Sequence, residues 1–102
     1  DIYYDLAKLL GGIILNYKRI KSGQFDASLS NNNSNINFSY IEDEYSLSHQ
    51  EIIYQFHHKN NLNIDNTRKL LSLIYINMSP LHEPPFDLLL LAYANKIFWS
   101  NA

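Results

Sequence analysis

The stretch from Phe86 to Trp99, FDLLLLAYANKIFW, is the most apolar part of the chain, and it limits what the chain can fold into. It is interrupted by Asp87, Asn95 and Lys96 and is shorter than the roughly 20 apolar residues that a membrane span needs. Its apolar residues recur at helical spacing, and the two prolines before it suit a first helical turn. We therefore expect a helix from Pro85 to about Trp99 that other segments of the chain bury.

The N-terminal stretch has the pattern of a long amphipathic helix. From Ile2 to about Ser22, apolar residues recur every three or four positions, which predicts one helix. Gly11 and Gly12 interrupt this pattern, and each costs roughly 1 kcal/mol of helix propensity relative to alanine. We expect them to mark a bend or the close approach of another backbone.

Two more helices are predicted in the second half of the chain. Ser48 and Glu51 have the spacing of a capping box, which predicts a helix from about His49 to Lys59. Asp65 is the candidate N-cap of the next helix, which should end at Met78 because Ser79-Pro80 follows.

Alternating residues between these helices predict a β-hairpin over residues 24–41, with an asparagine-rich turn between its strands. An irregular loop is the alternative interpretation. The predicted fold is thus mainly α, with about four helices and one hairpin in a single compact domain or subdomain spanning residues 1–102.

Composition excludes several classes of function. With a length of 102 residues and 46% hydrophobic content, the chain is long enough for one buried core and too short for two domains. Its net charge of -2 offers no basic surface for nucleic acid. There is no cysteine, which fits a reducing compartment, and no signal-peptide pattern opens the chain, so we expect a cytoplasmic location.

The sequence contains no recognisable catalytic centre or metal site. No glycine-rich phosphate loop and no nucleophile elbow occurs, and the four histidines lack the spacing of zinc ligands. His57 and His58 are expected to offset the helix dipole near a C-terminus. We therefore predict no catalytic residue and no metal ligand within this chain.

Asp5 is the most informative carboxylate in the sequence. An acid in the first helical turn is favoured by the helix dipole, by about 0.3 to 1 kcal/mol. Asp5 also lies between Tyr4 and Leu6, close to the apolar stripe, so we expect a partly buried carboxylate. Such a group needs hydrogen-bond donors, and these should come from outside its own helix.

Two stretches resemble a known family. Tyr4-Asp5-Leu6-Ala7 resembles the Tyr-Asp-Leu-Ala signature of the aminoglycoside phosphotransferase and choline kinase superfamily. The segment INMSPLHEPPFDLLLL, residues 76–91, resembles the last helices of bacterial members associated with capsule or surface-polysaccharide synthesis. The resemblance implies the C-terminal helical portion of a protein-kinase-like large lobe.

The resemblance also implies roles for individual residues. Asp5 would hold the backbone of the catalytic loop, and the aromatic residues Tyr93 and Trp99 would line an acceptor pocket for a sugar, choline or aminoglycoside-like molecule. Packing within the core is the alternative role for these aromatics. The nucleotide loop, the catalytic aspartate and the metal-binding aspartate of the family lie upstream of the Tyr-Asp-Leu-Ala helix.

The expected protein is therefore a C-terminal piece of a longer phosphotransferase, inactive by itself, whose partner is the remainder of the kinase-like domain. ATP and magnesium are implied for the longer protein and not for this chain alone. A chain cut from a larger lobe should also expose an apolar patch near the first helix. The alternative is a stand-alone helical interaction module without catalytic activity.

Overall fold

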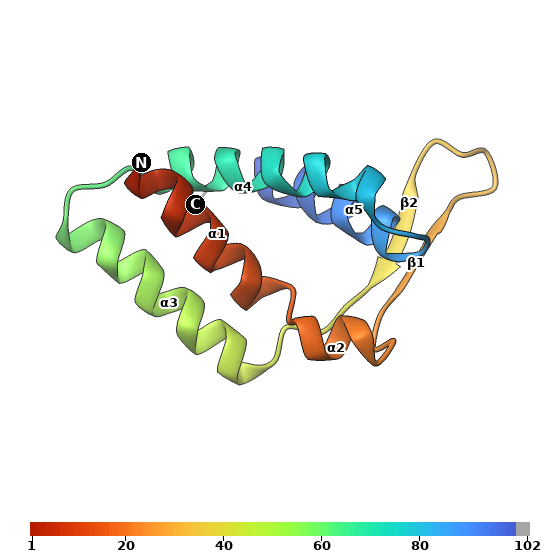
Figure 1. Ribbon diagram of the computed structural model, residues 1–102, viewed down its shortest axis with the longest axis horizontal. Coiled ribbons are helices and arrows are strands. Elements are labelled where there is room, and N and C mark those ends of the chain that lie inside the picture. The colour runs from red at the N-terminus through yellow and green to blue at the C-terminus, as the bar shows by residue number, and fades with distance from the viewer. Residues whose placement is uncertain (100–102) are drawn as a thin grey trace.

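The computed structural model describes residues 1–99 and is mainly helical with one antiparallel hairpin, as the sequence predicts (Figure 1). Its elements, in chain order, are α1 (Ile2–Ile14), α2 (Tyr17–Lys21), β1 (Asp26–Leu29), β2 (Ile36–Ser39), α3 (Glu44–Lys59), α4 (Ile64–Met78), the 3-10 helix η1 (Ser79–Leu81) and α5 (Phe86–Phe98). The molecule is elongated, with extents of 44 × 25 × 23 Å.

Helix α1 lies between α3 and α4, and α4 in turn packs along α5 (Figure 1). The hairpin packs against α5 at the end of the molecule opposite the loop between α3 and α4. The inner faces of α1, α4 and α5 supply most of the core. Its largest fully buried apolar side chains are Leu10, Leu71, Leu89, Leu90 and Tyr93.

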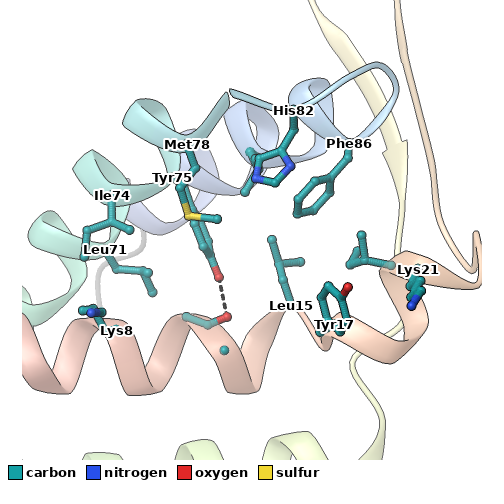
Figure 2. A pocket seen from close by; sticks show the side chains of 14 residues that line it. Lys8, Leu15, Tyr17, Lys21, Leu71, Ile74, Tyr75, Met78, His82 and Phe86 are labelled. Atoms are coloured by element: carbon teal, nitrogen blue, oxygen red, sulfur yellow. Dashed lines mark hydrogen bonds between the residues drawn. The ribbon is translucent and has the colours of Figure 1, made fainter. Parts of the chain in front are cut away.

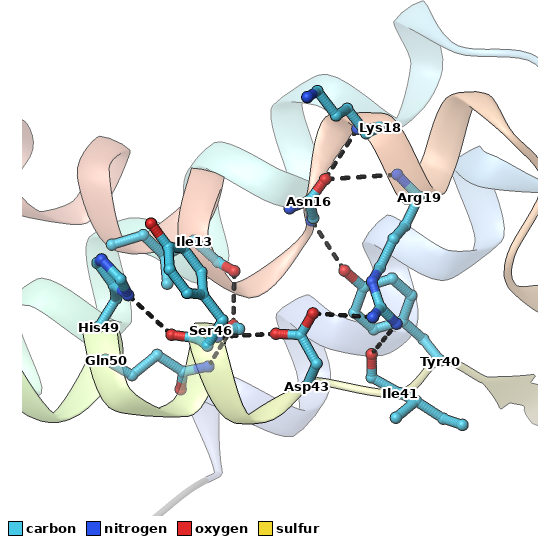
Figure 3. Close-up of polar contacts among 11 residues, drawn as sticks. Ile13, Asn16, Lys18, Arg19, Tyr40, Ile41, Asp43, Ser46, His49 and Gln50 are labelled. Atoms are coloured by element: carbon cyan, nitrogen blue, oxygen red, sulfur yellow. Dashed lines mark hydrogen bonds and ion pairs between the residues drawn. The ribbon is translucent and has the colours of Figure 1, made fainter.

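The predicted N-terminal helix is two helices. α1 ends at Ile14, and α2 begins at Tyr17, because Asn16 caps the second helix. The Asn16 Oδ1 atom accepts the backbone N–H groups of Lys18 (2.9 Å) and Arg19 (3.4 Å). The N–H of Asn16 donates to the Tyr40 hydroxyl at 2.8 Å, which fixes the break against the hairpin (Figure 3). Asparagine competes in this way with the continuing helix for backbone groups.

Helix α3 begins earlier than predicted. Its N-cap is Asp43, whose Oδ1 accepts the N–H of Ser46 at 2.8 Å, so the proposed capping box at Ser48 and Glu51 is wrong. The other oxygen, Oδ2, accepts from the Arg19 guanidinium at 2.8 Å (Figure 3). This contact joins α2 to the start of α3 and favours Asp43 over Ser48 as the cap.

The remaining helix ends lie close to the predicted positions. α4 is capped by Asn63, whose Oδ1 accepts the N–H of Asp65 at 2.9 Å, so Asp65 is a first-turn acid and not the predicted cap. α4 ends at Met78, as predicted, and the 3-10 helix follows it. α5 begins immediately after Pro85, again as predicted.

The hairpin is confirmed, with Ala27 opposite Phe38 and Leu29 opposite Ile36. Asn33 has a φ of 56°, the left-handed conformation for which asparagine is suited, and lies in the turn between the strands. The face that carries Ala27 and Phe38 turns toward α5, where the Phe38 ring meets the Tyr93 ring edge-on at 5.6 Å. The other face, including Asp26, is exposed, as expected for a hairpin that covers a helix on one side.

The two adjacent glycines of α1 have different environments. A Cβ atom at Gly11 would lie 2.6 Å from Cδ1 of the buried Leu71, and the Gly11 carbonyl accepts the Tyr75 hydroxyl at 2.8 Å. The close approach at Gly11 is thus made by side chains of α4 and not by a backbone. Gly12 is exposed, and a Cβ there would meet no atom within 4 Å. α1 continues as a helix through both glycines.

Alanine at each glycine should therefore have opposite effects. Gly11→Ala is expected to lower the free energy of unfolding by about 1 to 3 kcal/mol, because it overpacks the contact with Leu71. Gly12→Ala is the matched control and should raise it by up to about 1 kcal/mol through helix propensity alone. Urea unfolding of both variants measures the difference, and equal effects at the two positions would contradict the described packing of α1 on α4.

Candidate functional site

Asp5 lies in the first turn of α1 and is exposed, so the expected partial burial is wrong. The buried face of α1 is formed by Leu6, Ala7 and Leu10, and the helical register turns Asp5 away from it. Within residues 1–99 no side chain or distant backbone group donates a hydrogen bond to its carboxylate. As an exposed group, the Asp5 carboxylate is accessible to solvent and to another segment.

Asp5 shares its outward face with apolar side chains. Ile2 and Leu9, three residues before and four residues after Asp5, are 48% and 55% exposed. Gly12 continues the same stripe, and its surroundings are open. We call these four residues the outer stripe of α1; it lies in the region where the sequence predicts exposed apolar surface.

Tyr93 and Trp99, the predicted acceptor-pocket residues, are not brought together. Tyr93 is 2% exposed, whereas Trp99, just beyond the end of α5, is 71% exposed. The rings of Phe38 and Tyr40 pack edge-on against Tyr93 at 5.6 and 5.9 Å. Tyr93 is therefore part of the core; its hydroxyl end meets polar groups, and the Lys96 ammonium lies over its ring, 5.0 Å from the centroid.

That hydroxyl end borders a small polar cavity of about 130 Å³ between α1, α3, α4 and α5. The Tyr93 hydroxyl donates to Oε2 of Glu42 at 3.1 Å, and the ammonium of Lys96 lies 3.6 Å from the same oxygen. The Gln50 amide donates to Oε1 of Glu42 at 2.7 Å. Glu42 precedes α3 in an irregular segment, so helical or strand periodicity could not indicate it.

The environment keeps this tyrosine protonated. Burial raises the pKa of Tyr93 well above its ordinary value, and the negative charge of Glu42 raises it further. The hydroxyl is therefore a hydrogen-bond donor at neutral pH, and Glu42 accepts from it. This arrangement positions the Glu42 carboxylate.

Arg68 borders the same cavity, and one of its guanidinium nitrogens lacks a partner among the described residues. The side chain is 13% exposed, and its guanidinium lies over the Tyr54 ring, 5.4 Å from the centroid. Nη1 is buried, and the nearest carboxylate oxygen, on Asp65, is 3.7 Å away, beyond hydrogen-bond range. A buried cationic nitrogen requires an acceptor, so the cavity is suited to water or another small polar group.

His57 forms a buried link between α3 and α4. The ring is 1% exposed; its Nδ1 lies 2.8 Å from the Ile53 carbonyl, and its Nε2 lies 2.6 Å from the Thr67 hydroxyl. A carbonyl only accepts, so the proton is on Nδ1 and the Thr67 hydroxyl donates to Nε2 in the neutral ring. His57 thus links the two helices, and both His57 and His58 lie in the last turn of α3, the predicted position near a helix C-terminus. Among residues 1–99, no three histidine or acidic side chains gather as metal ligands.

An apolar groove of about 450 Å³ lies beside α1 (Figure 2). Its floor comes from α1 and α4, with Tyr75 donating to the Gly11 carbonyl, and its far wall comes from Met78 and Phe86. Lys8 and Lys21 lie at its two ends. Local sequence patterns do not indicate this groove, because residues of four helices and of two connecting segments combine to form it.

No family model, curated protein or solved structure matches this chain. None of the helices in the part of the chain that the structure describes is long and apolar enough to cross a membrane.

Proposed function

We propose that this chain is the C-terminal helical portion of a small-molecule phosphotransferase of the aminoglycoside phosphotransferase and choline kinase type. Its role is to support the catalytic loop of the longer protein. The single observation that carries the proposal is the outer stripe of α1, in which an exposed carboxylate lies between exposed apolar side chains.

The stripe has the chemistry of a surface that packs against another segment. Ile2 and Leu9 offer apolar area, and Asp5 between them offers a charged acceptor for backbone N–H groups. A loop lying along Ile2, Asp5 and Leu9 would cover the apolar area and donate to Asp5.

The small polar cavity at Tyr93 lies on the other side of α1, where Leu10 and Ile14 border it. In the proposed protein, Tyr93 and Glu42 stabilise the part of the fold next to the pocket for the phosphate-accepting substrate. The exposed Trp99 is available to contact that substrate. ATP and magnesium are implied for the longer protein. The described residues form no metal-ligand cluster, so no step of the reaction is assigned to them.

Replacing Asp5 tests the proposed support of the loop in the longer protein. Asp5→Ala should lower kcat for phosphate transfer by about 10- to 100-fold with little change in KM, because the catalytic loop loses an anchor and shifts. Glu51→Ala, an exposed acid on α3, is the matched control and should leave kcat unchanged. In this chain by itself both side chains are exposed, so its thermal unfolding should be nearly the same in both variants. Unchanged kcat in Asp5→Ala would refute the role given to Asp5.

A stand-alone helical interaction module is the second candidate, and the exposed apolar groove favours it. The coding sequence upstream of Asp1 distinguishes the two. A His-x-Asp motif followed roughly 15 to 25 residues later by a second aspartate would support the phosphotransferase, as an order-of-magnitude spacing for such loops. A start codon immediately before Asp1 would support the interaction module.

A further inference from the structure

The apolar groove beside α1 has the size and lining of a small-molecule site. Its volume of about 450 Å³ lies within the range of roughly 300 to 1,000 Å³ that is usual for ligand pockets. Its walls are aliphatic, aromatic and thioether side chains, its two lysines lie at the ends, and the Tyr75 hydroxyl on its floor already donates to the Gly11 carbonyl (Figure 2). We propose that the groove binds an amphipathic carboxylate, a molecule with an extended apolar body and one anionic end.

The charged residues of the groove argue for an anion. Lys8 and Lys21 both line it, at opposite ends, and no acidic residue is among the lining residues in the described part of the chain (Figure 2). The groove is therefore positive on a chain whose net charge is -2. Such a site favours an anion over a cation or a neutral molecule with the same apolar body.

The two lysines have no carboxylate partner within residues 1–99. Each ammonium lies near an exposed tyrosine ring of its own helix, Lys8 at 5.5 Å from the Tyr4 centroid and Lys21 at 5.9 Å from the Tyr17 centroid. These contacts are weak at exposed positions, and they leave the ammonium hydrogens able to donate to a ligand. One carboxylate can thus pair with a lysine at one end while its tail lies along the groove.

The apolar body has a continuous surface to contact. Leu15 at the end of α1, Met78 of α4 and Phe86 of α5 face the same space in Figure 2. Gly12 is part of the lining, and the absence of a side chain there keeps the α1 side of the groove open. An open groove would explain why a glycine, which is unfavourable in a helix, occupies this position of α1. The inference does not depend on the proposed phosphotransferase role.

The chain offers a single reporter for this site, because Met78 is its one methionine and lines the groove. With a ¹³C-labelled methionine methyl group, titration with decanoate should give a saturable shift of one NMR signal. Decyltrimethylammonium has a decyl chain and the opposite charge, and we expect it to bind at least about tenfold more weakly, the effect of one charge pair. Equal binding of both probes would overturn the proposal, as would no saturable shift with decanoate.

Variants separate the groove from nonspecific detergent-like binding. Gly12→Leu should fill the open side and weaken decanoate binding at least about tenfold, while the helix itself becomes no less stable. Replacing both Lys8 and Lys21 with glutamine should abolish the preference for decanoate over the cation. Lys69→Gln, an exposed lysine of α4 outside the groove, is the control and should change nothing. A Met78 signal that changes with protein concentration alone would show that a second copy occupies the groove, which would overturn the proposal.

Discussion

Leu89→Ala is expected to lower the free energy of unfolding by about 2 to 5 kcal/mol, the usual cost of removing a buried leucine side chain. Leu89 is fully buried in α5, the helix that packs against both α4 and the hairpin. Replacing the Leu89 side chain with alanine removes buried apolar area from the core. It also leaves a cavity that the neighbouring residues fill only partly when they relax. A domain of this size is stabilised by only about 5 to 15 kcal/mol, so the variant should unfold at much lower urea concentration.

An exposed leucine provides the matched control for this experiment. Leu73 lies on α4 and is 56% exposed, so Leu73→Ala removes the same atoms without opening a cavity. Its expected effect is within about 0.5 kcal/mol. Urea unfolding followed by far-UV circular dichroism measures both variants. Equal destabilisation by the two substitutions would contradict the described burial of α5.

Apolar spacing alone predicted most of the helical content. The stripes that predict helices in the second half of the chain correspond to α3, α4 and α5, because the buried face of each helix repeats with the helical period. Proline supplied the sharpest boundaries. Pro80 and Pro85 mark the end of α4 and the start of α5 to within two residues, since the ring restricts the backbone whatever lies around it.

The errors at the helix starts have a common physical cause. Residues able to cap a helix occur at several positions around each start, and tertiary contacts choose among them. Asp43 is selected over Ser48 because Arg19 binds its second oxygen. Asn16 breaks the first predicted helix where the Tyr40 hydroxyl accepts its N–H group. Both partners lie more than twenty positions away along the chain, so local patterns do not contain the answer.

The candidate sites were harder to predict than the fold for the same reason. Asp5 was expected to be partly buried because it is close to the apolar stripe of α1. Successive residues of a helix are rotated by about 100° about its axis, so Asp5 is exposed although the next residue, Leu6, is buried. Glu42 and Arg68 come from an irregular segment and from α4, and they share a cavity only because α1 and α5 bring these elements together. Residue types indicate which side chains can form ion pairs and hydrogen bonds. Which of these side chains lie close together depends on how the helices pack.

The stability of the fold should fall at alkaline pH because of a buried tyrosine. Tyr75 is 3% exposed, and its hydroxyl donates to the Gly11 carbonyl at 2.8 Å. Burial raises its pKa far above the ordinary value near 10, and the neighbouring Tyr93, Tyr40 and Glu42 raise it further. The folded chain therefore keeps a proton that the unfolded chain loses above about pH 10. The stabilisation is complete below that pH and decreases as the pH rises toward the pKa of the folded state.

Urea unfolding between about pH 8 and pH 12 measures this effect. For each such tyrosine, the free energy of unfolding should fall by about 1.4 kcal/mol per pH unit above pH 10. Tyr75→Phe should be less stable than the natural chain at neutral pH by about 1 kcal/mol, because the hydrogen bond to α1 is lost. Its stability should nevertheless fall less steeply with pH, by the slope of one proton. Tyr17→Phe, at a position that is 72% exposed, should have the same slope as the natural chain. If the free energy of unfolding of Tyr75→Phe falls with pH as steeply as that of the natural chain, the prediction is wrong. The Tyr75 hydroxyl would then ionise as readily in the folded chain as in the unfolded one.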